Sequence, residues 1–220
     1  MGLDYVDIFY SHRVDENTPM EETASALAQA VQSGKALYVG ISSYSPERTQ
    51  KMAELLREWK IPLLIHQPSY NLLNRWVDKS GLLDILAANG TGCIAFTPLA
   101  QGLLTGKYLN GIPDGSRMQR EGKKARGLTE NMLTDANLNS LRLLNEMAQE
   151  RGQTMAQMAL SWLLKDERVT SVLIGASRTE QLEENVQALN NLHFSEDELQ
   201  RIDRHVADGQ LNLWQASSDK

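Results

Sequence analysis

Short apolar segments alternate with longer, helix-like segments along most of the chain. The strand-like segments cover residues 5–10, 37–41, 63–66, 93–96 and 171–174. Consecutive parallel strands need a crossover of a dozen or more residues, which is usually a helix. The alternation therefore predicts right-handed strand–helix units and a parallel sheet, that is, an α/β fold. No linker-like stretch interrupts it, so residues 1–220 are expected to form a single domain.

Capping motifs mark where several helices should begin. A Ser or Thr directly precedes Pro at Thr18-Pro19 and Ser45-Pro46. A Ser stands three residues before Glu, as in a capping box, at Ser177-x-x-Glu180 and Ser195-x-x-Glu198. The helix that opens at Ser45 is expected to end near residue 59. Apolar residues at helical spacing predict further helices over residues 81–88, 138–148 and 155–163.

The regular alternation stops at residues 101–133, which contain six glycines and no steady apolar period. Loops of this length are uncommon unless they have a function. Three acidic residues stand there against six basic ones, Lys107, Arg117, Arg120, Lys123, Lys124 and Arg126. A local charge of +3 in a chain of net charge −6 favours a loop that binds phosphate over a merely solvated one.

Composition excludes several classes of protein. A net charge of −6 and a pI of about 5.3 argue against general nucleic-acid binding, which needs a positive field. No apolar run approaches the roughly 20 residues of a membrane helix. A single cysteine, Cys93, forms neither an internal disulfide nor a zinc site, so we expect no metal. Together these features predict a cytoplasmic protein with no membrane or nucleic-acid partner.

Polar residues follow each of the five strand-like segments. They are Ser11-His12-Arg13, Ser42-Ser43, Gln67, Thr97 and Gly175-Ala176-Ser177. A nucleotide-binding doubly wound sheet would carry G-x-G-x-x-G after its first strand, and the chain has no such motif. Polar groups at the carboxyl ends of successive parallel strands are instead what a TIM-type barrel uses to build a site.

In sequence order, these segments resemble motifs of the aldo-keto reductase family, in the bacterial branch near the potassium-channel β-subunits. The matching stretches are residues 5–13, 40–44, 67–71, 96–102 and 174–185. The resemblance implies a (β/α)8 barrel, of which the chain holds about five strands and lacks the N-terminal three units. The first and fifth strands would then be the edges of an open sheet. The catalytic Asp, Tyr and Lys of the family have no matching context here.

The same resemblance implies a role for the strand-end residues. His12 would hydrogen-bond the carbonyl oxygen of the substrate. Ser42, Ser43 and Gln67 offer the neutral donors and acceptors that a nicotinamide carboxamide needs. Phe96 would stack on the nicotinamide ring, although plain barrel packing explains it almost as well.

The remaining positions implied by the resemblance would hold the rest of NADP(H). Thr97, Leu99, Ala100 and Gly102 would approach the pyrophosphate, while Lys107 and Arg117 would clamp phosphate. Gly175 and Ser177 lie where a helix start would favour phosphate. Gln181, Glu184 and Asn185 would face the adenosine end, and Arg178 either binds the 2′-phosphate or faces solvent.

Three functional hypotheses follow. The first is an NADPH-dependent reductase of small aldehydes, phosphorylated or dicarbonyl, such as glyceraldehyde 3-phosphate or methylglyoxal, inactive as this chain alone. The second is a non-catalytic, NADP(H)-binding regulatory subunit of the channel type. The third is a structural domain with no ligand. Assembly into a homo-oligomer is left open.

Overall fold

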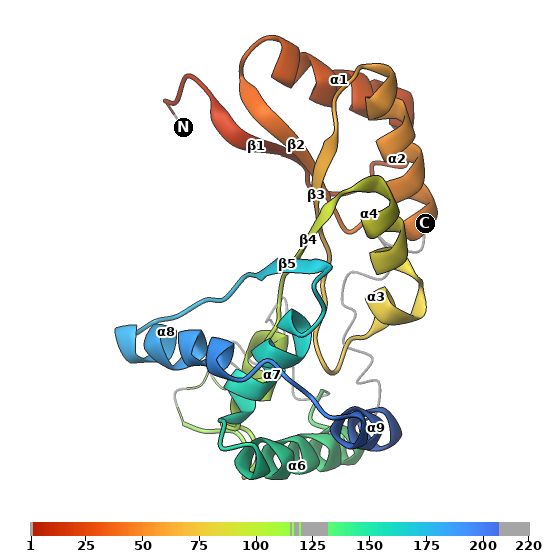
Figure 1. Cartoon of the computed structure of the whole chain (residues 1–220). Helices are drawn as coiled ribbons and strands as arrows, with labels where there is room; N and C mark the ends of the chain where they lie inside the picture. The colour runs from red at the N-terminus through yellow and green to blue at the C-terminus, as the bar shows by residue number, and fades with distance from the viewer. Residues whose placement is uncertain (1, 115, 117–118, 120–131, 207–220) are drawn as a thin grey trace.

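Five parallel strands form one sheet in the computed structural model, which describes residues 2–114, 116, 119 and 132–206. The strands are β1 (Val6–Ser11), β2 (Ala36–Ser42), β3 (Leu63–Gln67), β4 (Gly92–Ala95) and β5 (Val169–Val172). Their order in the sheet is β1-β2-β3-β4-β5, so each strand pairs with its neighbour in the sequence (Figure 1). The predicted α/β fold with a parallel sheet is confirmed.

Helices connect the strands, and two further helices come after β5 in the chain. They are α1 (Met20–Gln32), α2 (Pro46–Glu58), α3 (Trp76–Lys79), α4 (Leu82–Asn89), α6 (Asp135–Glu150), α7 (Met155–Leu164), α8 (Thr179–Val186) and α9 (Glu196–His205). Two short 3-10 helices, η1 (Ala100–Thr105) and η4 (Gln187–Asn190), complete the described elements. In the described part of the chain, no helix is long and apolar enough to cross a membrane.

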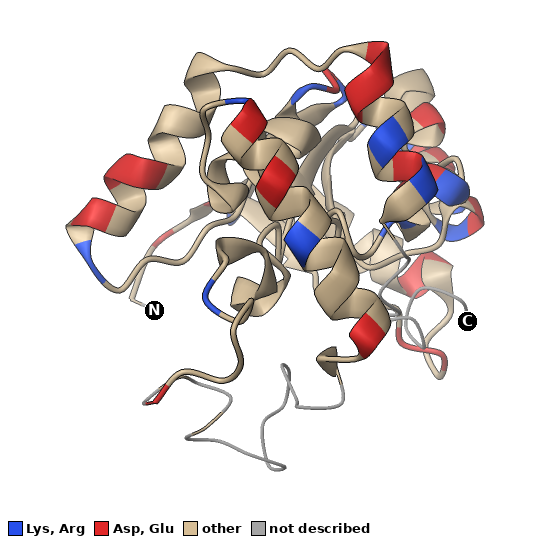
Figure 2. Cartoon of the chain, turned by 90° about the horizontal axis from the view of Figure 1, so that it is seen from below, with Lys and Arg blue, Asp and Glu red and all other residues tan. Residues whose placement is uncertain are grey.

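Two apolar clusters join the sheet to its helices. One packs α1 and α2 against the strand face that carries Val39 and Ile41. The other lies between β4, α4, α6, α7 and α9, with Trp162 among its largest fully buried side chains. The acidic and basic residues gather on the helices that cover the outside (Figure 2). The helices therefore cover one face of the sheet, whereas parallel sheets are usually buried on both faces.

The capping motifs are confirmed at two helices. Ser45 accepts a hydrogen bond from the backbone N–H of Arg48 and opens α2, and Ser195 with Glu198 forms a complete capping box at α9. The expectation for Thr18 is wrong. Its hydroxyl donates to the Asp15 carboxylate (2.7 Å), and α1 begins at Met20 with no side-chain cap.

Two glycines allow bulky side chains to cross the inner face of the sheet. A Cβ at Gly40 would lie 2.6 Å from the Tyr10 ring and 2.8 Å from Ile65, and a Cβ at Gly92 would lie 2.6 Å from Ile65. The β2–β3 register also shifts between Val39 and Gly40. Glycine at these positions thus gives Tyr10 and Ile65 the space they occupy.

We predict that Gly40→Ala lowers the free energy of unfolding by about 1–3 kcal/mol, because the new methyl group overpacks the inner face. Gly175→Ala is the matched control, since a Cβ there meets nothing within 4 Å. Urea denaturation of both variants measures the difference. Equal stability of the two variants would contradict the packing argument.

Candidate active site

A cavity of about 420 Å³ opens at the carboxyl ends of β1 to β4. It is lined by Tyr10, His12, Arg13, Ser42, Gln67 and Phe96. This volume lies in the range typical of small-molecule sites. Four of the predicted site residues, His12, Ser42, Gln67 and Phe96, are therefore brought together from four consecutive strand ends.

The turn after β2 is tied to the end of β3. The Ser42 hydroxyl donates to the backbone carbonyl of Gln67 (2.8 Å), and the backbone N–H of Ser43 donates to the same oxygen (3.3 Å). Ser43 has a φ of 57°. Its hydroxyl is buried without a hydrogen-bond partner among the described residues, and Ser43 does not line the cavity. Of this predicted pair, Ser42 alone faces the pocket.

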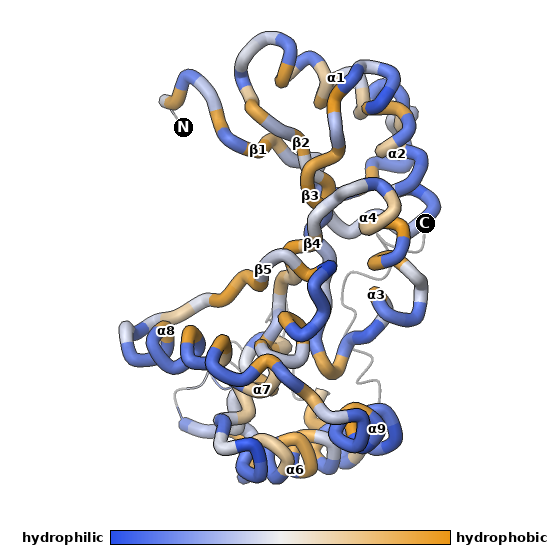
Figure 3. Tube along the Cα trace, in the orientation of Figure 1, coloured by the Kyte–Doolittle hydropathy of each residue, from blue (hydrophilic) through white to orange (hydrophobic). Residues whose placement is uncertain are grey.

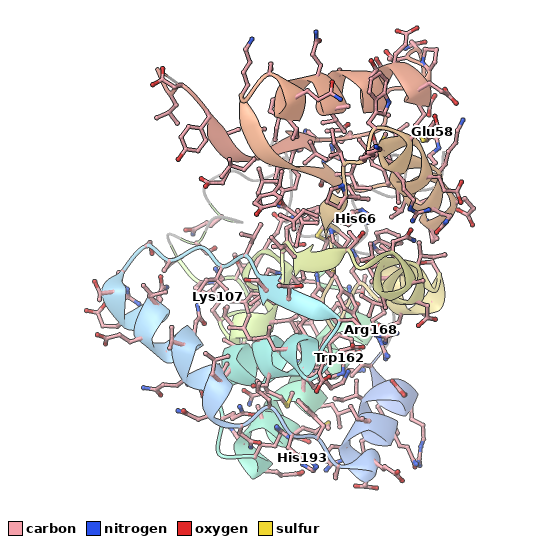
Figure 4. The ribbon with its side chains drawn as sticks, turned by 45° about the horizontal axis from the view of Figure 1, so that its top comes forward. Glu58, His66, Lys107, Trp162, Arg168 and His193 are labelled. Carbon is pink, nitrogen blue, oxygen red and sulfur yellow. The ribbon has the colours of Figure 1, made fainter. Side chains whose placement is uncertain are left out.

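Behind this turn, His66 is fully buried on the helix side of β3. Its Nε2 accepts the backbone N–H of Tyr44 (3.3 Å), which leaves Nδ1 to donate to the Thr49 hydroxyl (3.4 Å). Strand alternation places His66 on the face opposite to Gln67, and its buried contacts give it a structural role. Figure 4 shows it in the strand layer, whereas His193 lies at the other end of the molecule beside α9.

Burial lowers the pKa of His66 to about 3. The folded chain thus keeps this imidazole neutral across most of the acidic range. The Tyr44 phenol lies 2.8 Å from the Ser11 hydroxyl at the end of β1, and burial raises the pKa of this phenol. These contacts hold the ends of β1, β2 and β3 in one arrangement.

The segment after β4 has an unusual backbone. Thr97, Ala100 and Gln101 all have positive φ, between 47° and 56°, and Gly102 follows with 102°. Such strain persists where surrounding contacts hold it, and it clusters at functional sites. The Thr97 hydroxyl is engaged within the protein, since it donates to the Phe96 carbonyl (2.7 Å) and lies 3.0 Å from the Ser69 hydroxyl.

Two predicted phosphate-binding positions meet in this segment. The Lys107 ammonium would lie 2.8 Å from a Cβ at Gly102, so glycine lets the cation approach the backbone. The same ammonium lies 4.9 Å from the centre of the Tyr108 ring. Leu99 and Ala100 belong to the same turn, and neither lines the cavity.

Of the residues that the structure describes after β5, none lines the cavity. The predicted capping box of Ser177 with Glu180 is wrong. Helix α8 begins at Thr179, and Ser177 donates from both its backbone N–H (2.9 Å) and its hydroxyl (3.1 Å) to the Gln181 side chain. Gly175, Ser177 and Arg178 are exposed.

Two further predicted positions belong to α8. The carbonyl of Glu184 accepts a hydrogen bond from Gln157 (3.0 Å), and Asn185 is buried. Arg117, Arg120, Lys123, Lys124 and Arg126, all from the basic loop, lie outside the described residues.

Two residues that line the cavity were missed from the sequence, Tyr10 and Arg13. Tyr10 stands two positions before His12, and strand alternation could have placed both on one face. Burial raises the pKa of the Tyr10 phenol. Within the described ranges, no group of His, Cys, Asp and Glu could hold a metal ion.

The chain belongs to the aldo/keto reductase family, whose model matches residues 1–207. It is similar to two L-glyceraldehyde 3-phosphate reductases, from Escherichia coli K12 (88% identity) and O157:H7 (87% identity). Both comparisons cover all 220 residues of this chain and 64% of the relative. A putative voltage-gated potassium channel subunit beta from Schizosaccharomyces pombe is 36% identical over 190 residues, which is 86% of this chain and 55% of that protein.

Solved structures agree with the family. Glycerol dehydrogenase from Gluconobacter oxydans matches with a TM-score of 0.72 and 26% identity, over 93% of this chain and 60% of that one. A thermostable aldo-keto reductase, crystallised with the inhibitor epalrestat, matches with a TM-score of 0.66 and 28% identity, over 91% and 60%. These enzymes have TIM-barrel folds, so the five-stranded sheet corresponds to part of a barrel.

We predict that His66 makes the stability of the chain fall with acid. The folded imidazole stays neutral, whereas the unfolded chain takes up a proton below about pH 6.5, so falling pH favours unfolding. Between pH 6 and pH 4, the free energy of unfolding of the unmodified chain should fall more steeply than that of a His66→Gln variant, by up to about 1.4 kcal/mol per pH unit. Urea denaturation at several pH values measures both slopes, and parallel slopes would refute the assignment.

Proposed function

We propose that this chain carries the cofactor-binding and substrate-orienting part of an NADPH-dependent reductase of small aldehydes. The observation that carries the proposal is the shared cavity of His12, Ser42, Gln67 and Phe96. The similarity to L-glyceraldehyde 3-phosphate reductases supports a phosphorylated aldehyde as the substrate. Arg13 in the same cavity offers a cation for its phosphate. A cytoplasmic location belongs to the same proposal.

The residues around the cavity fit a nicotinamide. The Gln67 side chain offers both a donor and an acceptor to the carboxamide. The Ser42 hydroxyl donates its hydrogen bond to the backbone carbonyl of Gln67, so the lone pairs of the hydroxyl oxygen are left to accept a hydrogen bond from the carboxamide N–H. Phe96 adds an aromatic surface for the ring. When bound, the reduced nicotinamide supplies a hydride.

The chain's own residues act on the substrate carbonyl. His12 donates a hydrogen bond to the carbonyl oxygen and orients it before reaction. The buried Tyr44–His66–Thr49 contacts keep the neighbouring turn from moving. No tyrosine of this chain stands in the sequence context of the family's proton donor, so we propose that the chain alone does not turn over.

The turn at residues 99–102 and Lys107 are assigned to phosphate groups of the cofactor. Within this turn the N–H of Ala100 donates to the Thr97 carbonyl (2.9 Å) and that of Gly102 to the Leu99 carbonyl (2.8 Å), so the assignment rests on the charge of Lys107. The Lys107 ammonium lies against Gly102 in the same place. The exposed Gly175 and Arg178, before α8, are assigned to the adenosine phosphate, whereas both donors of Ser177 are engaged by Gln181.

A non-catalytic, NADP(H)-binding subunit is the second candidate. The 36% identity to the putative potassium channel subunit beta favours it. Both candidates require nucleotide binding, and they differ in turnover once the catalytic Asp, Tyr and Lys are supplied.

We expect the chain to bind NADPH, as measured by titration of nucleotide fluorescence. Lys107→Met should weaken NADPH binding by about tenfold to a hundredfold, because it removes one charge-assisted hydrogen bond. Lys35→Met removes an exposed ammonium just before β2 and serves as the control. Unchanged affinity in the Lys107 variant would reject the phosphate assignment, and no binding by the unmodified chain would reject both candidates.

We also expect no steady oxidation of NADPH when the chain alone is mixed with glyceraldehyde 3-phosphate. The physical reason is the lack of a positioned proton donor, which contributes about 10²–10⁴-fold to such reactions. Absorbance at the reduced-nicotinamide band measures the rate. Sustained turnover by pure chain would show that it holds its own proton donor.

A further inference from the structure

Thr97, the second residue after β4, has a backbone conformation that its residue type avoids. Its φ is 54°, in the left-handed region. A β-branched residue is an outlier there, so the conformation persists only where surrounding contacts hold it. Thr97 directly follows Phe96, which lines the cavity, and it precedes the turn at residues 99–102. The contacts that hold Thr97 therefore also determine where the Phe96 ring lies.

The backbone carbonyl of Thr97 is held by Asn71. The side-chain N–H of Asn71 donates to this carbonyl (2.9 Å), and the backbone N–H of Ala100 donates to the same oxygen (2.9 Å). The Oδ1 of Asn71 accepts the backbone N–H of Leu73 (2.9 Å), which fixes the amide with its NH2 group toward Thr97. Because Asn71 is buried, removing its side chain would leave these groups without a partner.

The Thr97 hydroxyl is held by a second asparagine, Asn74, through a chain of hydrogen bonds. The side-chain N–H of Asn74 donates to the Ser69 hydroxyl (3.0 Å), which lies 3.0 Å from the Thr97 hydroxyl. The Thr97 hydroxyl donates to the Phe96 carbonyl (2.7 Å), so Ser69 must be the donor to Thr97. Asn74 and Ser69 are both buried. All donors of the chain thus point the same way, an arrangement in which each bond polarises the next.

The segment that carries both asparagines is itself anchored. Asn71 and Asn74 exchange two backbone hydrogen bonds (3.2 and 3.0 Å). Leu72 and Leu73 between them are fully buried in the larger apolar cluster. Figure 3 shows a hydrophobic stretch in this segment between β3 and α3. The segment after β3 is therefore a fixed support for the backbone after β4.

We propose that Asn71 and Asn74 are positioning residues for the cofactor, which hold Thr97 in its strained conformation and thereby place the Phe96 ring against the nicotinamide. This role rests on the proposed NADPH site. Neither asparagine lines the cavity, so both act through Thr97. Without them, Thr97 returns to an ordinary negative φ, and the change of backbone direction moves the Phe96 ring away from the nicotinamide.

The first test compares NADPH affinities by titration of nucleotide fluorescence. Asn71→Ala should weaken NADPH binding at least tenfold. Thr91→Val is the matched control, because the buried Thr91 hydroxyl donates to the Leu63 carbonyl (2.9 Å) and ties β4 to β3 at the end of the sheet opposite to the cavity. This control should lower stability, as Asn71→Ala does, and leave the affinity within twofold of the unmodified chain. Equal affinity losses in both variants, or no loss in either, would overturn the proposal.

A glycine at position 97 separates positioning from general destabilisation. Glycine adopts a φ of 54° without strain, so the backbone no longer needs Asn71 to hold it there. In a Thr97→Gly background, Asn71→Ala should therefore weaken NADPH binding less than threefold, a coupling that the double-mutant cycle measures. The same loss with threonine and with glycine at position 97 would contradict the positioning role. If Asn71→Ala does not fold, Asn74→Ala takes its place in both measurements with the same expectations.

Amide hydrogen exchange supplies a readout that needs no nucleotide. The N–H of Ala100 donates to the Thr97 carbonyl (2.9 Å), and that of Leu173 donates to the Ala95 carbonyl (2.9 Å) across the neighbouring strand. In Asn71→Ala, exchange at Ala100 should be at least tenfold faster and exchange at Leu173 unchanged. No acceleration at Ala100, or the same acceleration at both, would overturn the proposal. A chain that binds no NADPH would reject the proposed function, and these rates would still decide whether Asn71 holds the turn.

Discussion

The site depends on one constraint, the unbroken order of five parallel strands. Each crossover brings the chain back to the same end of the sheet, so all carboxyl ends meet on one side. In a doubly wound sheet, a reversal of strand order opens a crevice that binds the ligand. This sheet has no reversal, so a ligand site must be built from the strand ends themselves, as in a barrel. The cavity between His12 and Phe96 is placed accordingly.

The register shift between β2 and β3 decides which polar group faces that cavity. It pairs Gly40 with Ile65, and from there Ser42 with Gln67 and Ile41 with His66. Since strand side chains alternate, a slip of one residue would send His66 into the cavity and Gln67 under α2. The glycine at position 40 supports the register, because Ile65 and Tyr10 both occupy the space of its missing side chain.

Sequence patterns predict the sheet and the polar strand ends because these depend on local periodicity. The α/β fold and the family are confirmed, as are the caps at Ser45 and Ser195. The Ser177 cap failed because a longer side chain, Gln181, competes for the same donors. Strand alternation could have placed Tyr10 on the face of His12, but the space that its ring occupies depends on Gly40, thirty positions away. The positive φ angles at Ala100 and Gln101 were missed because neither residue type favours them.

The proposed nucleotide site requires that distant strands of the sheet keep a fixed arrangement. The described residues that line the cavity come from β1 to β4 and the positions that follow them, while the segment assigned to the adenosine end follows β5. A nucleotide that contacts both needs the sheet to hold β1 and β5 in a fixed relation, which the ladder β1-β2-β3-β4-β5 supplies. A ligand that binds the folded chain and not the unfolded chain stabilises the fold by mass action. A nucleotide that spans the sheet in this way would therefore stabilise the ladder as a whole, and not only the strand ends that it contacts.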